Sequence, residues 1–287
     1  PNTLNPILTT DAYSSSIQGL IFNGLFTVDS ELNIIPELAT TYNIDETNTI
    51  YTVTINSSVK WHDGKPLTAD DIKYTYETYL SPSTNTVYRS NFIIDNKPIK
   101  INKQSTYSVQ FVLPKPFAPF LARLTTSIIA KHQFSSENIN QNPWNRNPVG
   151  AGPFVLDKWA TGQFIKLKKN THYFKSEPKI DAIISRFIPN DLTAIVSLEN
   201  KEIDESQVKP KDLKALENDP HLTTYSYQQM AYIYIGFNLT KKPFDSAIFR
   251  EAFARAINKE LIVKKVLMNQ GSPAELPNHP ISWAYPP

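Results

Sequence analysis

One stretch of the sequence, residues 59–79 (VKWHDGKPLTADDIKYTYETY), constrains the fold more than any other. Its Asp-Gly pair is a turn dipeptide, because glycine adopts positive φ without steric cost. Thr68 can accept a hydrogen bond from a free amide at the start of a helix, and Asp70 and Asp71 fall in its first turn, where the helix dipole favours negative charge. The residues expected on the buried face of this helix are Ile72, Tyr76 and Tyr79. The stretch predicts a strand, a tight turn and a capped helix that form a rigid corner.

The composition limits the kind of protein that the chain can be. With 287 residues and 40% hydrophobic content, it can bury one large core or two smaller ones. The net charge is +2 with lysines scattered among acids, a pattern that argues against nucleic-acid binding. No apolar run reaches the roughly 18 residues of a membrane span. The sequence has no cysteine, which excludes disulfides, thiolate catalysis and cysteine-bound zinc within it.

Catalysis and nucleotide binding receive little support from the motifs. Asp63, Asp70 and Asp71 beside His62 would suit a hydrolase with paired carboxylates. Turn and helix-start acids explain the same residues on stability grounds, and we favour that interpretation. The only close glycine pair lies in VGAGPF at residues 149–154, with no third glycine and no following Lys-Ser/Thr, so a phosphate-binding loop is not predicted.

Metal binding and serine nucleophiles are also poorly supported. The remaining histidines show neither HxH nor HExxH spacing; they are His132, His172, His221 and His279. The sequence has no G-x-S-x-G elbow, so the serines at 14–16 are interpreted as helix-start residues. We therefore expect no catalytic residue and no metal ligand.

Hydrophobic periodicity predicts the other helices and strands. Helices are expected at residues 11–26, within 114–129, at 191–200 and 211–218, after residue 245, and at 258–267, with a turn-helix at 36–42. Strands are expected at 49–55, twice within 99–113, from 155, at 164–174, at 180–189 as a buried strand, and at 232–238. The chain thus predicts an α/β protein.

Three segments carry a resemblance to a known family. They are the pattern W-x-D-G-x-P-x-T-A-x-D at residues 61–71, NPVGAGPFVLDKW at 147–159, and the strand and helices at 231–267. Together they resemble the signatures of the family 5 extracellular solute-binding proteins, the peptide-binding receptors of ABC importers. The chain departs from the family at single positions, with Asn23 in place of a frequent acid, Tyr42 in place of Trp, Ala151 in place of Thr and Phe154 in place of Tyr.

The resemblance implies a fold and a division of the chain. The fold would be type II periplasmic-binding-protein-like, with a mixed-sheet lobe and an inserted α+β subdomain. Residues 1–27 and 148–240 would form the parental subdomain of lobe I, and residues 28–147 the inserted one. Residues 241–287 would begin lobe II, most of which would be missing, so the chain is expected to be a fragment.

The resemblance also implies a function. The protein would be a monomeric receptor, not an enzyme, that delivers oligopeptides or dipeptides to an ABC permease and uses no cofactor. It would lie outside the cytoplasmic membrane, either lipid-anchored through a cysteine preceding residue 1 or in the periplasm. Within the family, the solute could instead be a nickel chelate, haem, an oligosaccharide or a signalling peptide. A hydrolase or a peptide-holding chaperone remains an alternative from another class.

The ligand contacts implied for lobe I come from four places along the chain. The expected residues are Tyr13, Ser14 and Ser15 in the first helix, Tyr88 and Arg89 in the following polar loop, Glu205, Ser206, Gln207 and Val208, and Asn238 at the end of a strand. In the family, the acid that pairs with a peptide's amino terminus lies in lobe II. Backbone pairing to an extended peptide and roomy side-chain pockets would supply the affinity.

Overall fold

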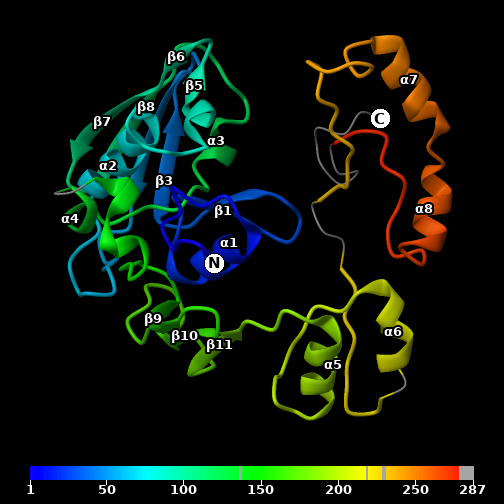
Figure 1. The fold of residues 1–287 in the computed structure, drawn as a ribbon. Coiled ribbons are helices and arrows are strands. Elements are labelled where there is room, and N and C mark those ends of the chain that lie inside the picture. The colour runs from blue at the N-terminus through cyan, green and yellow to red at the C-terminus, as the bar shows by residue number, and fades with distance from the viewer. Residues whose placement is uncertain (136–137, 218, 228–230, 278–287) are drawn as a thin grey trace. The chain divides into compact units, whose positions relative to one another are not determined.

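The computed structural model describes residues 1–135, 138–217, 219–227 and 231–277 (Figure 1). The chain forms two units, Pro1–Phe187 and Ile188–Pro287, and each is described by itself. Unit 1 contains a four-stranded sheet, a three-stranded sheet, two two-stranded pairs and the buried core, whereas the described residues of unit 2 form helices joined by turns and irregular segments.

The larger sheet of unit 1 packs against the helix of the predicted corner. Its strand order is β3-β4-β8-β7, with bounds Ala39–Ile44, Ile50–Ile55, Ser108–Val112 and Lys100–Ser105. In β4, Tyr51, Val53 and Ile55 are buried and alternate with less buried residues, because successive side chains of a strand point to opposite faces. Neighbouring strands pair Tyr51 with Phe111, which places two aromatic rings at the centre of the core.

Helix α2, Ala69–Leu80, packs against β7 and β8 of this sheet, as the sequence predicts (Figure 1). Thr68 is its N-cap, and the Thr68 amide donates to Asp71 Oδ2 at 2.9 Å. Tyr76 is fully buried, with its ring centroid 5.0 Å from that of Phe111 and 5.2 Å from that of Phe92. Burial of each such side chain contributes about 1.5–3 kcal/mol relative to leaving it exposed.

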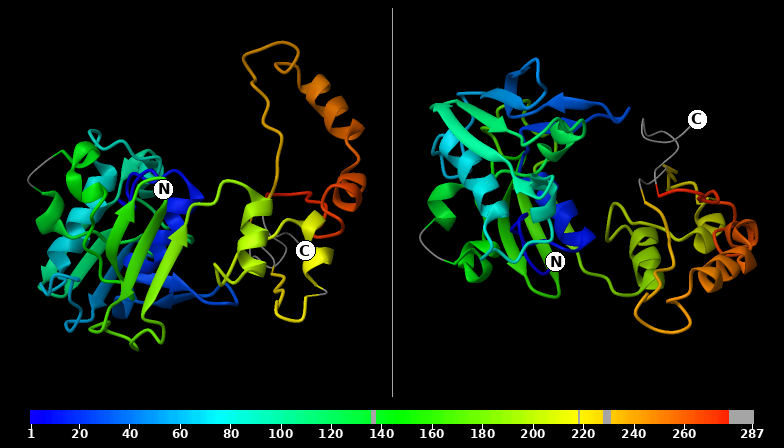
Figure 2. Two further views of the ribbon diagram at one scale, coloured as in Figure 1. Left: turned by 60° about the horizontal axis from the view of Figure 1, so that its bottom comes forward. Right: turned by 90° about the horizontal axis from the view of Figure 1, so that it is seen from above.

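The smaller sheet has the order β11-β10-β9, and its strands lie side by side in Figure 2. Their bounds are Ala182–Arg186, Phe164–Lys169 and Phe154–Ala160, and helix α1, Ala12–Ile21, packs against β9. Just before β9, Gly150 and Gly152 lie against the last turn of α1. A Cβ on Gly150 would come within 1.9 Å of the Ile21 carbonyl oxygen, so this approach requires glycine.

Short elements complete unit 1. The two-stranded pairs are β1 with β2, Phe26–Val28 and Ile34–Pro36, and β5 with β6, Ile93–Ile94 and Lys97–Pro98. The short helices are η1 at Arg89–Phe92, α3 at Phe120–Arg123, α4 at Lys131–Phe134, η2 at Ile139–Gln141 and η3 at Pro143–Asn145.

Unit 2 contains α5, α6, α7 and α8, with bounds Asp191–Glu199, Pro210–Leu216, Ala247–Ala256 and Lys259–Lys265. Three of these helices begin at a side chain that accepts backbone amides, namely Asn190, Ser246 and Asn258. Most apolar side chains described in this unit are exposed, although Leu216 is buried. No described helix in either unit is long and apolar enough to cross a membrane.

The structure corrects several predicted elements in unit 1. The helix predicted at 11–26 ends at Ile21, because Gly24 instead bridges Ser127 and Phe26 begins β1. The turn-helix predicted at 36–42 is wrong: these residues end β2 and form most of β3, which pairs with β4. The helix predicted within 114–129 is limited to four residues of α3.

The predicted strands in the second half of the chain also differ. The strand predicted to be buried at 180–189 forms as β11, but it is an edge strand and Ile184 is exposed. Residues 232–238, where a strand is predicted, form none in the structure. Strand pairing needs a partner that local propensity does not supply, and this segment has none among the described residues.

Candidate functional site

The first three predicted ligand residues lie at the start of α1 and differ in their exposure to solvent. Tyr13 is 79% exposed, and Ser15 is exposed while its hydroxyl donates to the Asp11 carbonyl at 3.1 Å. Ser14 is fully buried: its Oγ donates to Asp11 Oδ2 at 2.6 Å and accepts the Asn2 amide at 3.2 Å. Ser14 therefore fastens the N-terminal segment to the helix start, whereas Tyr13 and Ser15 face outward.

The predicted loop residues Tyr88 and Arg89 hold the chain that follows α2. Arg89 Nη2 donates to the carbonyls of Ser81 and Thr84, at 2.7 and 2.6 Å. The Tyr88 ring packs edge-on against Tyr79, with centroids 6.3 Å apart. Both side chains are half-buried, and the guanidinium adds hydrogen bonds to two carbonyls that also accept backbone amides within the loop. Arg89 thus fixes the shape of the 81–88 loop.

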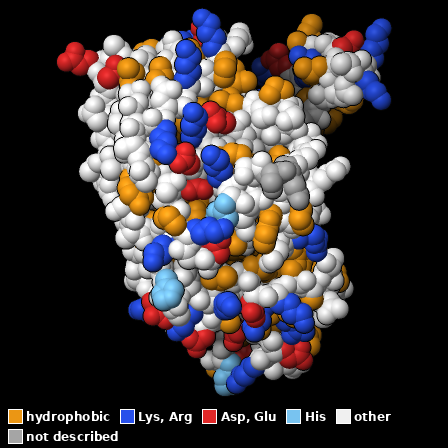
Figure 3. Space-filling model, turned by 90° about the vertical axis from the view of Figure 1, so that its left-hand side faces the viewer, with side chains coloured by type: hydrophobic (Ala, Val, Ile, Leu, Met, Phe, Trp, Pro, Cys, Tyr) orange, Lys and Arg blue, Asp and Glu red, His pale blue; other side chains and the backbone are white. Residues whose placement is uncertain are grey.

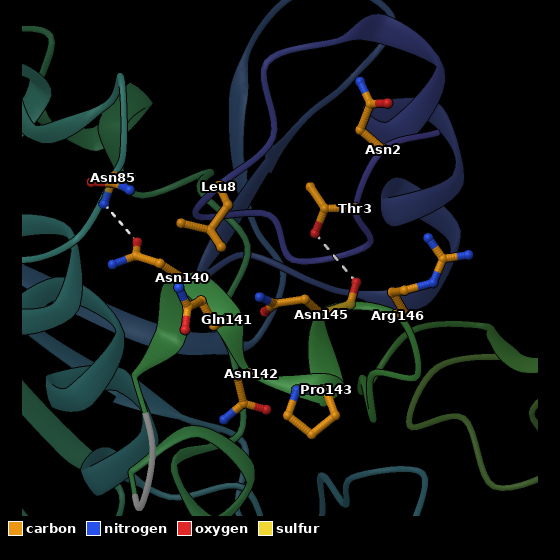
Figure 4. Close-up of a pocket in the computed structure, with 10 residues that line it drawn as sticks. All are labelled: Asn2, Thr3, Leu8, Asn85, Asn140, Gln141, Asn142, Pro143, Asn145 and Arg146. Carbon is orange, nitrogen blue, oxygen red and sulfur yellow. Dashed lines mark hydrogen bonds between the residues drawn. The ribbon is translucent and has the colours of Figure 1, made fainter.

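Between these two regions lies a pocket of about 470 Å³ (Figure 4). Three segments line it: the N-terminal segment, the 81–88 loop and the stretch from η2 through η3. The lining residues are Asn2, Thr3, Leu8, Asn85, Asn140, Gln141, Asn142, Pro143, Asn145 and Arg146. Asn2 is bonded to Ser14, and Asn85 belongs to the loop that Arg89 shapes, so the pocket adjoins both predicted contact regions.

The inner asparagines of the pocket are fixed by hydrogen bonds within the protein. Asn145 is buried: its Nδ2 donates to the Ile139 carbonyl at 2.8 Å, and its Oδ1 accepts Asn5 Nδ2 at 2.8 Å. Asn142 is buried as well, and its Oδ1 accepts the Trp144 amide at 2.9 Å. Asn140 Oδ1 accepts the Asn85 amide at 2.8 Å, drawn in Figure 4. Because these side-chain amides are hydrogen-bonded within the protein, their orientations along the pocket wall are fixed.

The rim of the pocket is different, because the side chains of Asn2, Asn85 and Gln141 are exposed. The side-chain amides of Asn2, Asn85 and Gln141 make no hydrogen bond within the described residues. Arg146 Nη2 donates to Thr161 Oγ1 at 2.7 Å. Sequence reasoning missed this site; the available signal was the dense run of amides NINQNPWNRN at residues 138–147.

The acids and the histidine of the central stretch have structural partners. Asp63 Oδ2 pairs with His132 Nε2 at 2.8 Å, and Asp70 pairs with Lys103 at 2.6 Å. Asp71 Oδ1 accepts the Lys131 amide at 2.9 Å, while its other oxygen caps α2. On the face shown in Figure 3, positive and negative side chains are mixed. The ion pairs and hydrogen bonds of Asp63, Asp70 and Asp71 support their interpretation as turn and helix-start residues.

His62 joins the central stretch to the glycine pair. Its Nδ1 accepts the Gly150 amide at 3.2 Å, so Nε2 carries the proton and donates to the Gly152 carbonyl at 3.0 Å. Burial lowers the pKa of His62 from its ordinary value of 6.5, because an imidazolium would lose solvation there. The neutral imidazole therefore holds residues 150–152 against the central stretch by two hydrogen bonds. Within the described part of the chain, no group of three potential metal ligands occurs.

Comparison with known families decides the identity of the chain. The sequence model described as "Bacterial extracellular solute-binding proteins, family 5 Middle" matches residues 33–287. The chain belongs to this family. The match includes all three segments that carry the resemblance, at 61–71, 147–159 and 231–267, and nearly all of the described strands and helices.

Relatives in family 5 agree with this placement over the whole chain. The oligopeptide-binding protein AppA of Bacillus subtilis is 32% identical over 292 residues, covering 100% of this chain and 53% of AppA. Its structure in complex with a nonapeptide matches with a TM-score of 0.93 at 32% identity, covering 100% of this chain and 57% of that one. The chain therefore spans about half the length of the relatives it matches.

Two further solved structures that match this chain hold different solutes. NikZ from Campylobacter jejuni, in complex with Ni(L-His), has a TM-score of 0.87 at 29% identity, covering 94% of this chain and 54% of NikZ. DppA from Helicobacter pylori, in complex with the peptide STSA, has a TM-score of 0.84 at 25% identity, covering 99% and 59%. These matches confirm the predicted type II periplasmic-binding-protein fold and the mixed α/β class.

The remaining predicted ligand residues lie in unit 2. Glu205 and Gln207 are exposed, whereas Ser206 and Val208 are half-buried. Asn238 is exposed, and its Oδ1 accepts the amide and the hydroxyl of Thr240 at 3.1 and 2.7 Å. Their participation in one ligand site with Tyr13, Ser14, Ser15, Tyr88 and Arg89 stays a prediction.

Proposed function

We propose that this chain is the ligand-binding part of a receptor that captures oligopeptides or dipeptides and delivers them to an ABC permease. The observation that carries the proposal is the match over 100% of the chain to AppA, whose solved structure holds a nonapeptide. The receptor acts as a monomer without a catalytic step. It works on the outer side of the cytoplasmic membrane, held by a lipid anchor or free in the periplasm.

The proposal includes a division of the chain and a set of contacts. Residues 1–27 and 148–240 form the parental subdomain of lobe I, residues 28–147 are inserted, and residues 241–287 begin lobe II. Tyr13, Ser15 and Tyr88 contact the peptide directly, together with residues 205–208 and Asn238. Ser14 and Arg89 act through the segments that they hold, since their polar atoms are engaged within the protein.

The test is native mass spectrometry of the full-length protein as purified, followed by denaturation and identification of released molecules. We expect a series of short peptides, whose lengths give the preference of the site. Isothermal titration with synthetic peptides supplies the second arm. A protein that is purified empty and binds no peptide in the titration would contradict the proposal.

A second candidate solute is a nickel chelate, favoured by the match to NikZ with Ni(L-His). The two candidates separate in one competition experiment, in which the full-length protein is titrated with nickel and histidine before and after saturation with a nonapeptide. Nickel-dependent binding of histidine in the absence of any peptide binding would move the function to chelate uptake.

A further inference from the structure

His62 makes three hydrogen bonds to a segment that lies 88 to 90 residues later in the chain. Its backbone amide donates to the Gly150 carbonyl at 2.8 Å. On the ring, Nδ1 accepts the Gly150 amide at 3.2 Å, and Nε2 donates to the Gly152 carbonyl at 3.0 Å. Because Nδ1 accepts a hydrogen bond, the imidazole is neutral and its one proton is on Nε2.

Residues 150–152 also contact the last turn of α1. The Gly152 amide donates to the Ile21 carbonyl at 2.8 Å, and Ile21 is fully buried. A Cβ on Gly150 would come within 1.9 Å of the same carbonyl oxygen, so the two backbones are in direct contact. Any movement of residues 150–152 away from His62 therefore acts on the end of α1 as well.

Protonation of the His62 ring reverses the role of Nδ1. An imidazolium carries a proton on both nitrogens, so Nδ1 becomes a donor. It then faces the Gly150 amide, which is also a donor, and that amide loses its acceptor. Nε2 donates to the Gly152 carbonyl in both protonation states. Acid therefore weakens the contact specifically at Gly150.

Burial and one carboxylate act on the ring in opposite directions. Burial lowers the pKa of His62 below 6.5, whereas the Gly152 carbonyl and the Asp63 carboxylate favour the protonated form. Asp63 is also engaged by other side chains, because its Oδ2 lies 2.8 Å from His132 Nε2 and 3.5 Å from Lys65 Nζ. Its influence on the His62 ring is therefore shared.

The other segments around the ring bring no further charge close to it. Residues 149–153 hold no ionisable side chain, and neither do residues 18–22 at the end of α1. In the turn after β10, Asn170 Nδ2 donates to the Gly152 carbonyl at 3.0 Å, and His172 is exposed. Titration of His62 is thus the change that acid makes at this contact.

We infer that His62 makes this contact sensitive to acid: protonation of its ring increases local opening of residues 150–152 and of the last turn of α1, while the sheets of unit 1 stay folded. Local opening of this kind requires less free energy than global unfolding. A donor left without its acceptor raises the open population by about tenfold. The inference goes beyond the proposed function, since it involves no ligand. Family 5 proteins are extracellular, so the pH of the surrounding medium acts on this contact.

The experiment is hydrogen exchange by mass spectrometry on the full-length protein at pH 7 and pH 5, with rates corrected for the intrinsic pH dependence of amide exchange. We expect exchange about tenfold faster at pH 5 for residues 150–152 and for the end of α1. The amides of β4 and β8 should stay protected over the same labelling times, because their exchange requires opening of the sheet.

Three histidine variants connect this acceleration to the ring of His62. His62→Gln should abolish the difference between the two pH values, because glutamine does not titrate. His172→Gln is the matched control, since His172 lies in the neighbouring turn but is exposed. His132→Gln tests the histidine that pairs with Asp63. Both of these controls should keep the tenfold acceleration, and circular dichroism verifies that each variant is folded.

The inference is overturned if residues 150–152 exchange at the same corrected rate at both pH values, or if a folded His62→Gln variant keeps the acceleration. It is also overturned if β4 and β8 lose protection together with residues 150–152, since acid would then unfold unit 1 as a whole.

If His62→Gln does not fold, the unmodified protein and the two control variants decide. Acceleration limited to residues 150–152 and the end of α1 in all three proteins supports the inference. Loss of the acceleration in His132→Gln or His172→Gln would assign it to that histidine and overturn the role of His62.

Discussion

The apolar side chains of unit 1 and unit 2 have opposite surroundings. In unit 1, Tyr76, Phe111 and Leu167 are completely buried, each under a strand or helix from elsewhere in the sequence. In unit 2, Ile233 and Ile248 are 88% and 81% exposed. The helices of unit 2 form their hydrogen bonds within their own turns, with Ser246 and Asn258 as caps of α7 and α8. Helical hydrogen bonds thus join neighbours in sequence, whereas sheets need partners from a distance.

The largest expected difference between the units concerns a core phenylalanine. Phe111→Ala should lower the unfolding free energy of unit 1 by about 3–5 kcal/mol, because it leaves a cavity among Tyr76, Tyr51 and Phe120. Phe249→Ala in unit 2, at a side chain 38% exposed, should cost about 1 kcal/mol or less. In a Trp283→Phe background, urea unfolding followed by the fluorescence of Trp61, Trp144 and Trp159 measures unit 1, and hydrogen exchange measures unit 2. Equal losses in both units would break the comparison.

The second prediction contrasts two glycines. Gly150→Ala should destabilise unit 1 by about 1–3 kcal/mol, because the new methyl group would overlap the Ile21 carbonyl and force the backbone apart. Gly236→Ala in unit 2 meets only the Tyr234 ring, at 3.6 Å, and should change stability little. Thermal melts of both variants provide the measurement. A stable Gly150→Ala variant would show that α1 does not need its close approach to residues 150–152.

The third prediction concerns helix caps. Asp71→Ala should cost about 1–2 kcal/mol, because it removes the acceptor for the Thr68 amide and for the distant Lys131 amide. Asn258→Ala removes only the local acceptor of the Leu261 amide, so we expect local fraying of α8. Hydrogen exchange by mass spectrometry should show faster exchange over α2 and α4 together in the first variant, and over α8 alone in the second. Exchange confined to α2 in the first variant would contradict the tertiary role of Asp71.

The smallest expected effect depends on pH. Burial lowers the pKa of His62 below its ordinary value of 6.5, while the Gly152 carbonyl acts in the opposite direction. Below pH 6.5 the unfolded chain binds a proton that the folded protein resists, so stability falls as pH drops through this window and levels off below the folded pKa. The Asp63 carboxylate beside the ring partly offsets the loss.

Urea midpoints between pH 7.5 and 5 measure this dependence. His62→Gln should show a flatter profile than the unmodified protein, because glutamine does not titrate. The difference between the two profiles isolates His62 from the carboxylates that titrate at lower pH. Parallel profiles would mean that the imidazole is not held neutral in the folded state.

Features that depend on local contacts are predicted from the sequence, whereas features that depend on distant contacts are not. The Thr68 start of α2 and the alternation in β4 are encoded within a few residues, and both are confirmed. The interpretation of 36–42 as a turn-helix failed, because pairing of Tyr42 with Val53 overrode local propensity. The asparagine-rich pocket could not be assembled from the sequence, since it joins residue 2 to residues 85 and 146.

The hydrogen bonds that join the N-terminal segment and α1 to residues 145–152 also limit when unit 1 can fold during synthesis. Leu4 receives its backbone partner from Asn145, and the Ile21 carbonyl accepts the Gly152 amide. The ribosome makes about 5–20 residues per second, so the nascent N-terminal segment remains without these partners for several seconds. The N-terminal segment is therefore an open polypeptide at this stage, and unit 1 closes only after residue 152 has been made.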